Sequence, residues 1–372
     1  MLFSSQLVAA ADASERDVES ADDRAYELDA VYTSDLWRNT KGGLRTGGAY
    51  LDNLDVTLAL DAERAMGWTG VSAFVYGLYN NSTRFSDRYV GDAMTVSNID
   101  APEAVRLYEA WIQWQSAAEH ALSFRLGLYD LNSEFDMSDG RSLFLHSSHG
   151  IGHDLGQTGA NGPSIFPVTS LGLRAAWSPA PQWSALVAVL DAVPGSPEHP
   201  SSNRIRVSGD EGALAIAELQ WAGERVTKVS LGHWRYTADE NCGTYAGIEV
   251  ALDRDSGHEP TTLAFARYGV ADDRLNEFAD SWSVGVRRRG VFAARPEDQI
   301  GVAYTRADVS DAASAHRHQY EAAIELTYRA ELTDWLAIQP DIQLILNPGA
   351  DPALEDSLVF GLRLEFSAFA QR

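Results

Sequence analysis

Hydrophobic and polar residues alternate with a period of two along most of the chain, which is the pattern of β-strands. In "SLVFGLRLEFSAF", near the C-terminus, large apolar side chains occupy every second position from Leu358 to Phe366, and Arg363 and Glu365 lie on the opposite face. The segments "NLDVTLALD" and "LSFRLGLYD" show the same alternation. The pattern therefore predicts a protein built from β-strands that each have one apolar and one polar face.

Sixteen segments fit this description. They are residues 26–38, 48–61, 69–81, 104–116, 121–132, 168–178, 183–193, 212–222, 226–238, 242–253, 260–271, 280–291, 299–310, 318–332, 335–347 and 356–369. Strands of soluble domains usually have about 5–6 residues, whereas a tilted strand that crosses a membrane needs about 9–11. The predicted strands are long enough to cross a membrane.

The connections between these segments differ in length according to their order. The long connections, residues 82–103, 133–167 and 194–211, are all odd-numbered, whereas even-numbered connections such as 179–182, 223–225 and 333–334 are short. Short turns on one rim and long loops on the other are typical of outer-membrane barrels. The sequence therefore predicts an all-β protein: a 16-stranded antiparallel transmembrane β-barrel with long extracellular loops, short periplasmic turns and both termini on the periplasmic side. Its charged strand faces are expected to line a wet lumen.

Composition narrows the function. The chain has 53 Asp plus Glu against 29 Lys plus Arg, a formal charge of −24, which argues against a nucleic-acid partner because phosphate binding needs a basic surface. Cys242 is the only cysteine, so neither a disulfide within the chain nor a cysteine-based metal site is expected. The first residues, "MLFSSQLVAAADA", predict a signal-peptide remnant at 1–13, followed by an N-terminal segment at 14–25 and the barrel at 26–372.

Several stretches resemble the carbohydrate-selective porins, the glucose-porin family of Gram-negative outer membranes. They are "RLYEAWIQW", "FRLGLYDLNSEFD", "GANGPSIFPVTSLGLRAAW", "LGHWRYT" and "LAIQPDIQLILNPG". The resemblance implies a homotrimeric barrel in the Gram-negative outer membrane, in contact with lipid and lipopolysaccharide, through which small sugars diffuse passively without a cofactor. It also implies that the connection 133–167 folds inward and narrows the pore.

The stretch "HSSHGIGHD", from His146 to Asp154, lies in that connection and raises the question of a metal site. The glycines at 150 and 152 make a helix unfavourable, so the spacing of the histidines does not place them on one face. The sequence also lacks an H-E-x-x-H motif. Polar loop histidines in contact with water are therefore the favoured interpretation, and no metal is expected; a partial positive charge near pH 6, in or near the constriction, is the other alternative.

Six residues are candidates for the pore constriction. Arg125 and Arg174 fall on the polar face of adjacent predicted strands, and a guanidinium donates to hydroxyl groups without a change of protonation. Glu109 offers acceptors, while an aromatic ring such as Trp111 or Tyr129 suits the apolar face of a sugar. Arg106 opens the same motif as Glu109 but falls out of phase with that face. For each of these residues, a purely structural role in the wall stays open.

Other functions are weaker alternatives. A barrel enzyme of the serine-hydrolase kind would need a nucleophile motif such as G-x-S-x-G, which the sequence lacks, so an enzyme is not expected. A soluble carbohydrate-binding β-protein would not sort its connections by length. A porin for another small solute, such as an organic acid or a cation, differs from a sugar porin only in the lumen charge, so the sequence leaves that alternative open.

Overall fold

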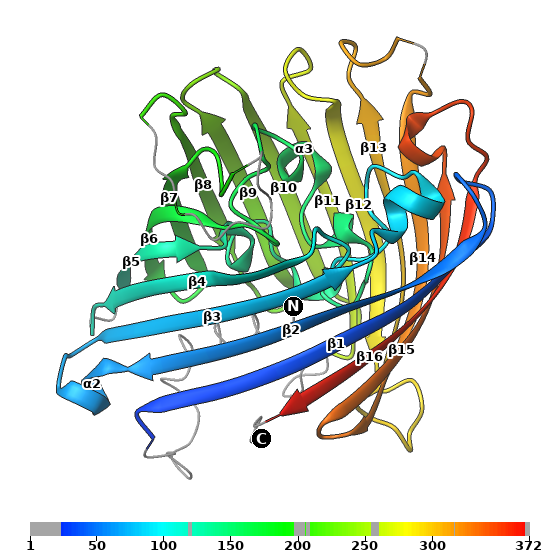
Figure 1. The fold of residues 1–372 in the computed structure, drawn as a ribbon. Coiled ribbons are helices and arrows are strands. Elements are labelled where there is room, and N and C mark those ends of the chain that lie inside the picture. Colours follow the sequence, from blue (N-terminus) through cyan, green and yellow to red (C-terminus); the bar gives the residue numbers. More distant parts are fainter. Residues whose placement is uncertain are drawn as a thin grey trace.

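The chain closes into one β-barrel. The computed structural model describes residues 24–117, 121–196, 205, 209–253, 260–315 and 317–368. Within them, sixteen strands pair antiparallel with their sequence neighbours, and β1 pairs with β16 to close the barrel (Figure 1). The predicted fold and strand number are confirmed. The predicted signal-peptide remnant at 1–13 lies outside the described residues, as does the predicted N-terminal segment at 14–25 except for residues 24 and 25.

The strands agree with the predicted segments to within a few residues. Their bounds are β1 Tyr26–Lys41, β2 Gly47–Asp61, β3 Val71–Ser82, β4 Ala104–Gln115, β5 Leu122–Tyr129, β6 Ser170–Ala180, β7 Trp183–Asp191, β8 Ala213–Trp221, β9 Val226–Tyr236, β10 Cys242–Ala251, β11 Thr262–Ala271, β12 Phe278–Arg289, β13 Gln299–Val309, β14 Tyr320–Thr333, β15 Leu336–Leu346 and β16 Ser357–Ala368. The predicted strand 121–132 is too long, because the Asp130 side chain accepts a hydrogen bond from the Asn132 N–H (2.8 Å) and starts a 3₁₀ turn.

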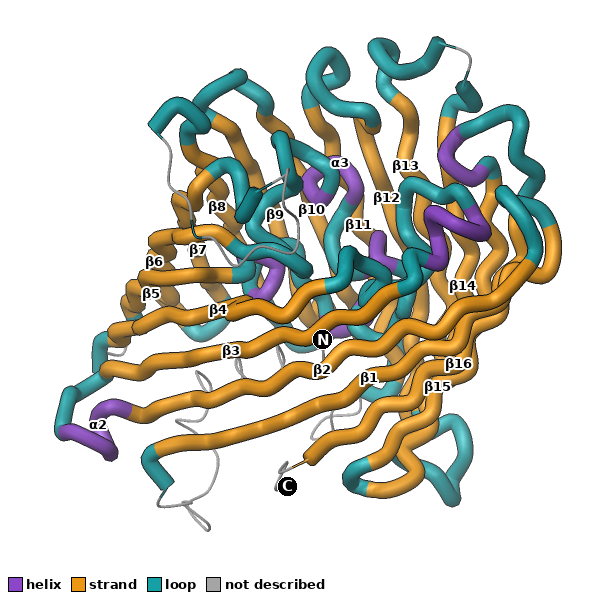
Figure 2. Tube along the Cα trace, in the orientation of Figure 1, coloured by secondary structure: helices purple, strands orange, loops and turns teal. Residues whose placement is uncertain are grey.

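Helices are few and short. They are α2 (Ala62–Met66), the π-turn η1 (Ser86–Val90), the 3₁₀ turns η2 (Leu131–Ser133), η3 (Asp139–Arg141), η4 (Ser147–His149) and η5 (Pro348–Ala350), and α3 (His153–Gly156). None of the helices in the described residues is long and apolar enough to cross a membrane. Several of these short helices belong to connections that lie inside the barrel (Figure 2).

The outer surface of the barrel is apolar and carries aromatic side chains near the short turns. Exposed tryptophans lie at or next to the ends of the strands on this rim: Trp68, Trp114, Trp177, Trp183 and Trp335. Tryptophan and tyrosine gather where a membrane meets water, because one end of the ring is apolar and the other polar. The position of these tryptophans agrees with the predicted periplasmic rim.

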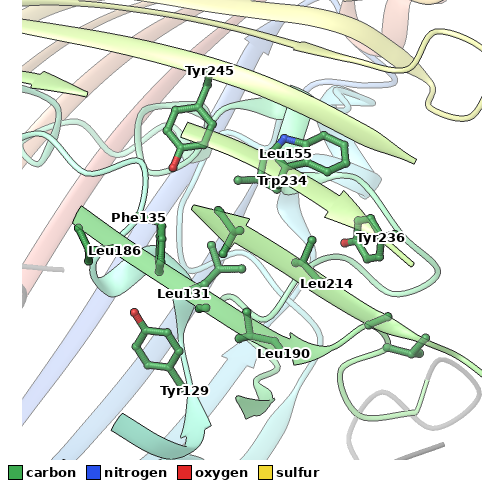
Figure 3. Close-up of a cluster of buried hydrophobic side chains, with 14 residues drawn as sticks. Tyr129, Leu131, Phe135, Leu155, Leu186, Leu190, Leu214, Trp234, Tyr236 and Tyr245 are labelled. Atoms are coloured by element: carbon green, nitrogen blue, oxygen red, sulfur yellow. The ribbon is translucent and has the colours of Figure 1, made fainter. Parts of the chain in front are cut away.

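The lumen is not uniformly wet, which corrects the expectation from the sequence. A hydrophobic cluster fills the space between the wall β7–β10 and the connection that follows β5 (Figure 3). Trp234, Tyr236 and Tyr245 point inward from the wall and pack with Leu131 and Leu155 of the connection. The connection therefore has an apolar core of its own with the wall, which holds it inside the barrel.

Candidate pore constriction

Residues 130–169, which connect β5 with β6, cross the lumen and bond to other strands of the wall, from nearby β8 to distant β14. The backbone N–H of Asp136 donates to Glu218 on β8 (2.8 Å), and that of Leu145 donates to Glu325 on β14 (2.6 Å). All four of these residues are buried. The predicted inward course of this connection is confirmed.

An arginine on the wall holds the middle of this connection. Arg267 on β11 forms ion pairs with Asp136 (3.0 Å) and Asp154, and Arg141 reaches Asp136 from within the connection (2.9 Å). The Ser281 hydroxyl on β12 also donates to Asp154 (2.6 Å). Burial raises the pKa of Asp136, but the charges of Arg267 and Arg141 outweigh it and hold that pKa below its usual value. The connection is therefore fixed by buried, paired charges.

A second connection, residues 83–103 between β3 and β4, also enters the lumen. Its Ser97 hydroxyl donates to Asp35 on β1 (2.7 Å), and the Asn98 side-chain oxygen accepts from Arg363 on β16 (2.8 Å). The Asn98 N–H donates to the Leu145 carbonyl (2.8 Å), so the two inward connections are joined to one another. The sequence did not predict this course, because a polar connection of this kind has the composition of an exposed loop.

The two arginines predicted to line the pore lie side by side. Arg125 on β5 is directly opposite Arg174 on β6 in the strand register. Both donate to one amide oxygen, that of Gln113 on β4: Arg125 through Nε (3.1 Å) and Nη2 (3.0 Å), and Arg174 through Nη2 (2.8 Å). Three N–H donors thus share an oxygen that has two lone pairs.

Glu134, which sequence reasoning missed, joins the two arginines. Its carboxylate accepts from Arg174 Nε (2.9 Å) and Nη2 (2.8 Å) and lies 3.4 Å from Arg125 Nη1. Burial raises the pKa of Glu134, but Arg125 and Arg174 outweigh it and hold that pKa below its usual value. Glu134 belongs to the inward connection, so its carboxylate ties that connection to the wall at the arginines.

The predicted aromatic residues and Glu109 surround this pair. The Arg125 guanidinium lies over the Trp111 ring, 3.9 Å from its centroid, and 5.2 Å from the Tyr129 ring centroid. The Trp111 N–H donates to Glu109 (3.2 Å), and the Tyr129 hydroxyl donates to Glu134. The structure therefore brings five of the six predicted residues into one cluster. Tyr129 is also part of the hydrophobic cluster in Figure 3.

Arg106 lies farther along β4, beyond a β-bulge. Tyr76 on β3 is opposite Glu109, but the next residue of β3, Gly77, is opposite Leu107, so Tyr108 is the additional residue of the bulge. A bulge shifts the side-chain alternation by one. Arg106 is therefore buried on the lumen side, whereas the exposed Leu107 points outward.

Comparison with known proteins agrees with this architecture. A model of the carbohydrate-selective porins, the OprB family, matches residues 45–241 and 235–367. The chain belongs to the carbohydrate-selective porin family. It is 24% identical to Porin B of Pseudomonas aeruginosa over 92% of this chain and 87% of that protein, and 20% identical to the putative porin QuiX of Acinetobacter baylyi over 92% and 89%. The high-pH structure of Pseudomonas putida OprB superposes with a TM-score of 0.81, at 20% identity, over 92% of this chain and 94% of that one.

The histidines of this porin are not surface loop residues. His146, His149 and His153 lie in the inward connection and are buried, which corrects the expectation that they contact water. Burial lowers the pKa of His146 to about 3 and that of His153 to about 4, so the structure does not support the alternative interpretation, a partial positive charge near pH 6, for either residue. Among the described residues, no group of three His, Cys, Asp or Glu side chains is arranged to hold a metal ion.

Proposed function

We propose that this porin lies in the outer membrane of a Gram-negative bacterium and lets small sugars, such as glucose, diffuse through its pore. The observation that carries the proposal is the arginine pair beside the inward connection. A sugar presents hydroxyl oxygens that accept hydrogen bonds, and Arg125 and Arg174 direct three N–H groups at the single oxygen of Gln113. When a sugar hydroxyl oxygen accepts a hydrogen bond from one of these N–H groups, two N–H donors remain on the Gln113 oxygen, which matches its two lone pairs.

We propose that the other predicted residues contact the sugar directly or support the charged groups that do. Glu109 accepts hydrogen bonds from sugar hydroxyls, and Trp111 offers a ring to the apolar face of the sugar. Tyr129 acts through Glu134, to which its hydroxyl donates. Arg106 contributes positive charge farther along the lumen side of β4.

Transport is passive in this proposal, with no cofactor and no covalent step. The sugar gradient drives the flux, and the pore has to release what it binds. Conduction therefore favours binding that is strong enough for the sugar to enter and weak enough for it to leave. The matched family consists of porins, which agrees with a channel rather than an enzyme.

The test is the block of ion current by glucose in a planar bilayer. The double substitution Arg125→Ala with Arg174→Ala should abolish the block, because a hydrogen bond to a charged group contributes about 1.5–3 kcal/mol in a dry site and less in a wet pore. The pore should also become more cation-selective. Arg235→Ala with Arg274→Ala is the matched control, because it removes two positive charges from exposed positions. Unaltered glucose block in the first variant would contradict the proposal.

A cation as the solute is the second candidate, and the formal charge of −24 favours it. A charged lumen attracts counter-ions and raises their local concentration. The reversal potential in a salt gradient separates the two functions. A pore that is strongly cation-selective and insensitive to glucose would support the cation, whereas a small reversal potential together with glucose block would support the sugar.

Assembly and lipid contact complete the proposal. The family resemblance supports a homotrimer, and the apolar outer surface supports contact with outer-membrane lipid and lipopolysaccharide. The native mass of the protein in detergent tests the assembly. A mass equal to one chain plus its detergent would contradict the trimer while leaving the proposed transport untouched.

A further inference from the structure

Buried glutamates of the barrel wall hold the two inward connections. Glu321 on β14 accepts from the backbone N–H groups of Ala93 and Met94, at 2.8 Å each. Glu325, four residues farther along β14 and on the same face, accepts from those of Leu145 (2.6 Å) and His146 (3.1 Å). In the described part of the chain, neither glutamate pairs with an arginine or a lysine. Their partners are neutral peptide groups, so the strength of the contact depends on what surrounds each carboxyl.

Glu325 lies in a cluster of titratable side chains from both the wall and the connection. Its carboxyl is hydrogen-bonded to that of Asp341 on β15, and its Oε2 lies 3.8 Å from His149 Nε2. The rings of His146 and His149 lie 5.9 Å apart. We call Glu325, Asp341, His146 and His149 the β14 latch. A hydrogen bond between two carboxyls needs one shared proton, so the Glu325–Asp341 pair carries a single negative charge.

The polar atoms of the latch are incompletely satisfied. His146 Nε2, both ring nitrogens of His149 and Asp341 Oδ2 are buried without a hydrogen-bond partner in the structure, and so is Gln343 Oε1 beside them. Buried polar atoms are normally paired, and those that are not mark a strained site or a place for internal water. A neutral imidazole tolerates such surroundings, whereas an imidazolium needs two hydrogen-bond acceptors.

Within the latch, the single negative charge of the Glu325–Asp341 pair does not compensate two imidazolium groups, of which His149 alone lies beside it. The other charged groups around the latch add no compensation, because most of them are positive. Those that face it are Arg141 and His153 from the same connection, Arg363 from β16, which is paired with Asp35, and Arg267 from β11, which faces His153. Phenylalanine rings occupy the remaining side of His149, with Phe144 at 4.9 Å and Phe265 at 6.1 Å between centroids. The latch therefore favours neutral histidines.

We propose that the β14 latch is an acid-sensitive switch: protonation of His146 and His149 releases the connection 130–169 from the wall and widens the pore. Because the Asn98 N–H bonds to the Leu145 carbonyl, the connection 83–103 loosens with it. The proposal goes beyond sugar transport and does not depend on which solute the pore conducts.

The direction of the effect follows from proton linkage. Burial lowers the pKa of His146 to about 3, and burial also lowers that of His149 well below its usual value. A histidine in the released connection has a pKa of about 6.5. The inward state is therefore fully favoured above about pH 6.5 and loses stability as the pH falls below it. At pH 4.5, one such histidine shifts the equilibrium toward release by up to about 100-fold.

Hydrogen exchange measures the release directly. The protection factor of the backbone amides in residues 143–150 is determined by mass spectrometry at pH 7.5 and 4.5, corrected for the intrinsic exchange rate. We expect at least about a tenfold loss of protection at pH 4.5, with the barrel strands unchanged, and a higher single-channel conductance. Equal protection at the two pH values would overturn the proposal.

Two variants test whether the latch histidines cause the loss of protection at pH 4.5. His146→Asn with His149→Asn keeps polar side chains that do not titrate, so the loss of protection at pH 4.5 should disappear. His233→Asn is the matched control, because His233 is exposed on β9, and it should leave the acid response intact. If the double variant does not assemble, each single variant should reduce the acid response. A full acid response without the latch histidines would overturn the proposal.

Discussion

Arg125 and Arg174 occupy directly opposite positions on β5 and β6, and one carboxylate, that of Glu134, lies within 3.4 Å of both guanidinium groups. Like charges at opposite positions of a strand pair destabilise a sheet. Glu134 changes that balance, because it places a negative charge between two positive ones in a site that is shielded from bulk water. The carboxylate comes from the inward connection, so the arginines and the loop position each other.

The first prediction concerns Glu134→Gln. The substitution preserves the shape of the side chain but removes its charge, so the two arginines lose their common counter-ion. We expect the selectivity to shift toward anions and the inward connection to become less stable, since hydrogen bonds to charged groups contribute about 1.5–3 kcal/mol each. The reversal potential in a salt gradient measures the shift. Glu240→Gln, at a position where the side chain is 83% exposed, is the control and should change neither property.

The second prediction concerns Gly127→Ala. Gly127 lies opposite Trp111 with φ at +146°, a conformation that L side chains rarely adopt, and an added Cβ would be 2.1 Å from the Ala110 carbonyl oxygen. It would also be 2.6 Å from Trp111 Cα, so the backbone of β4 would have to move, and the Trp111 ring that supports Arg125 would move with it. We expect the variant to unfold at a clearly lower urea concentration, with strain of about 1–3 kcal/mol.

Gly77→Ala provides the comparison for that substitution. An added Cβ at Gly77 meets only the Val56 carbonyl oxygen, at 3.9 Å, and Gly77 does not have a positive φ. This variant should unfold close to the wild type. If the two alanine variants were equally stable, the close contact of Trp111 with Gly127 would have no structural importance.

The strand pattern predicted most of the fold because the alternation is local. Each residue of a barrel strand faces either outward or inward, so a period of two reports both the strand and the face. Arg125 and Arg174 were placed correctly for this reason. Arg106 was not, because the bulge at Tyr108 shifts the alternation, and nothing in the identity of Tyr108 indicates a bulge.

The local alternation of apolar and polar residues could not predict the contacts of the inward connections. Glu134 lies in a connection, and a glutamate there has the sequence signature of an exposed residue; only the course of the chain through the lumen brings it to the arginines. The same holds for His146 and His149, whose burial depends on Glu325 and Asp341 far along the chain. On β9, apolar side chains occur on both faces, because Trp234 and Tyr236 face inward and pack on the connection while Val229 and Leu231 are exposed.

The last prediction concerns the charge that fixes the inward connection. Arg267→Leu removes the arginine partner of Asp154 and one of the two arginine partners of Asp136, which keeps Arg141. Both carboxylates are buried, and breaking a buried ion pair on one side costs about 3–5 kcal/mol because the remaining charge, here that of Asp154, stays uncompensated. The barrel itself does not need this pair, so we expect the connection to leave the lumen while the strands remain assembled. Single-channel conductance should rise, and protection of residues 136–154 from hydrogen exchange should fall. Arg274→Leu is the control, since Arg274 forms its pair with Asp272 at an exposed position and its side chain is 79% exposed. Unchanged conductance and protection in Arg267→Leu would mean that the hydrophobic cluster and the wall glutamates suffice to hold the connection, and that the buried ion pairs add nothing to its position.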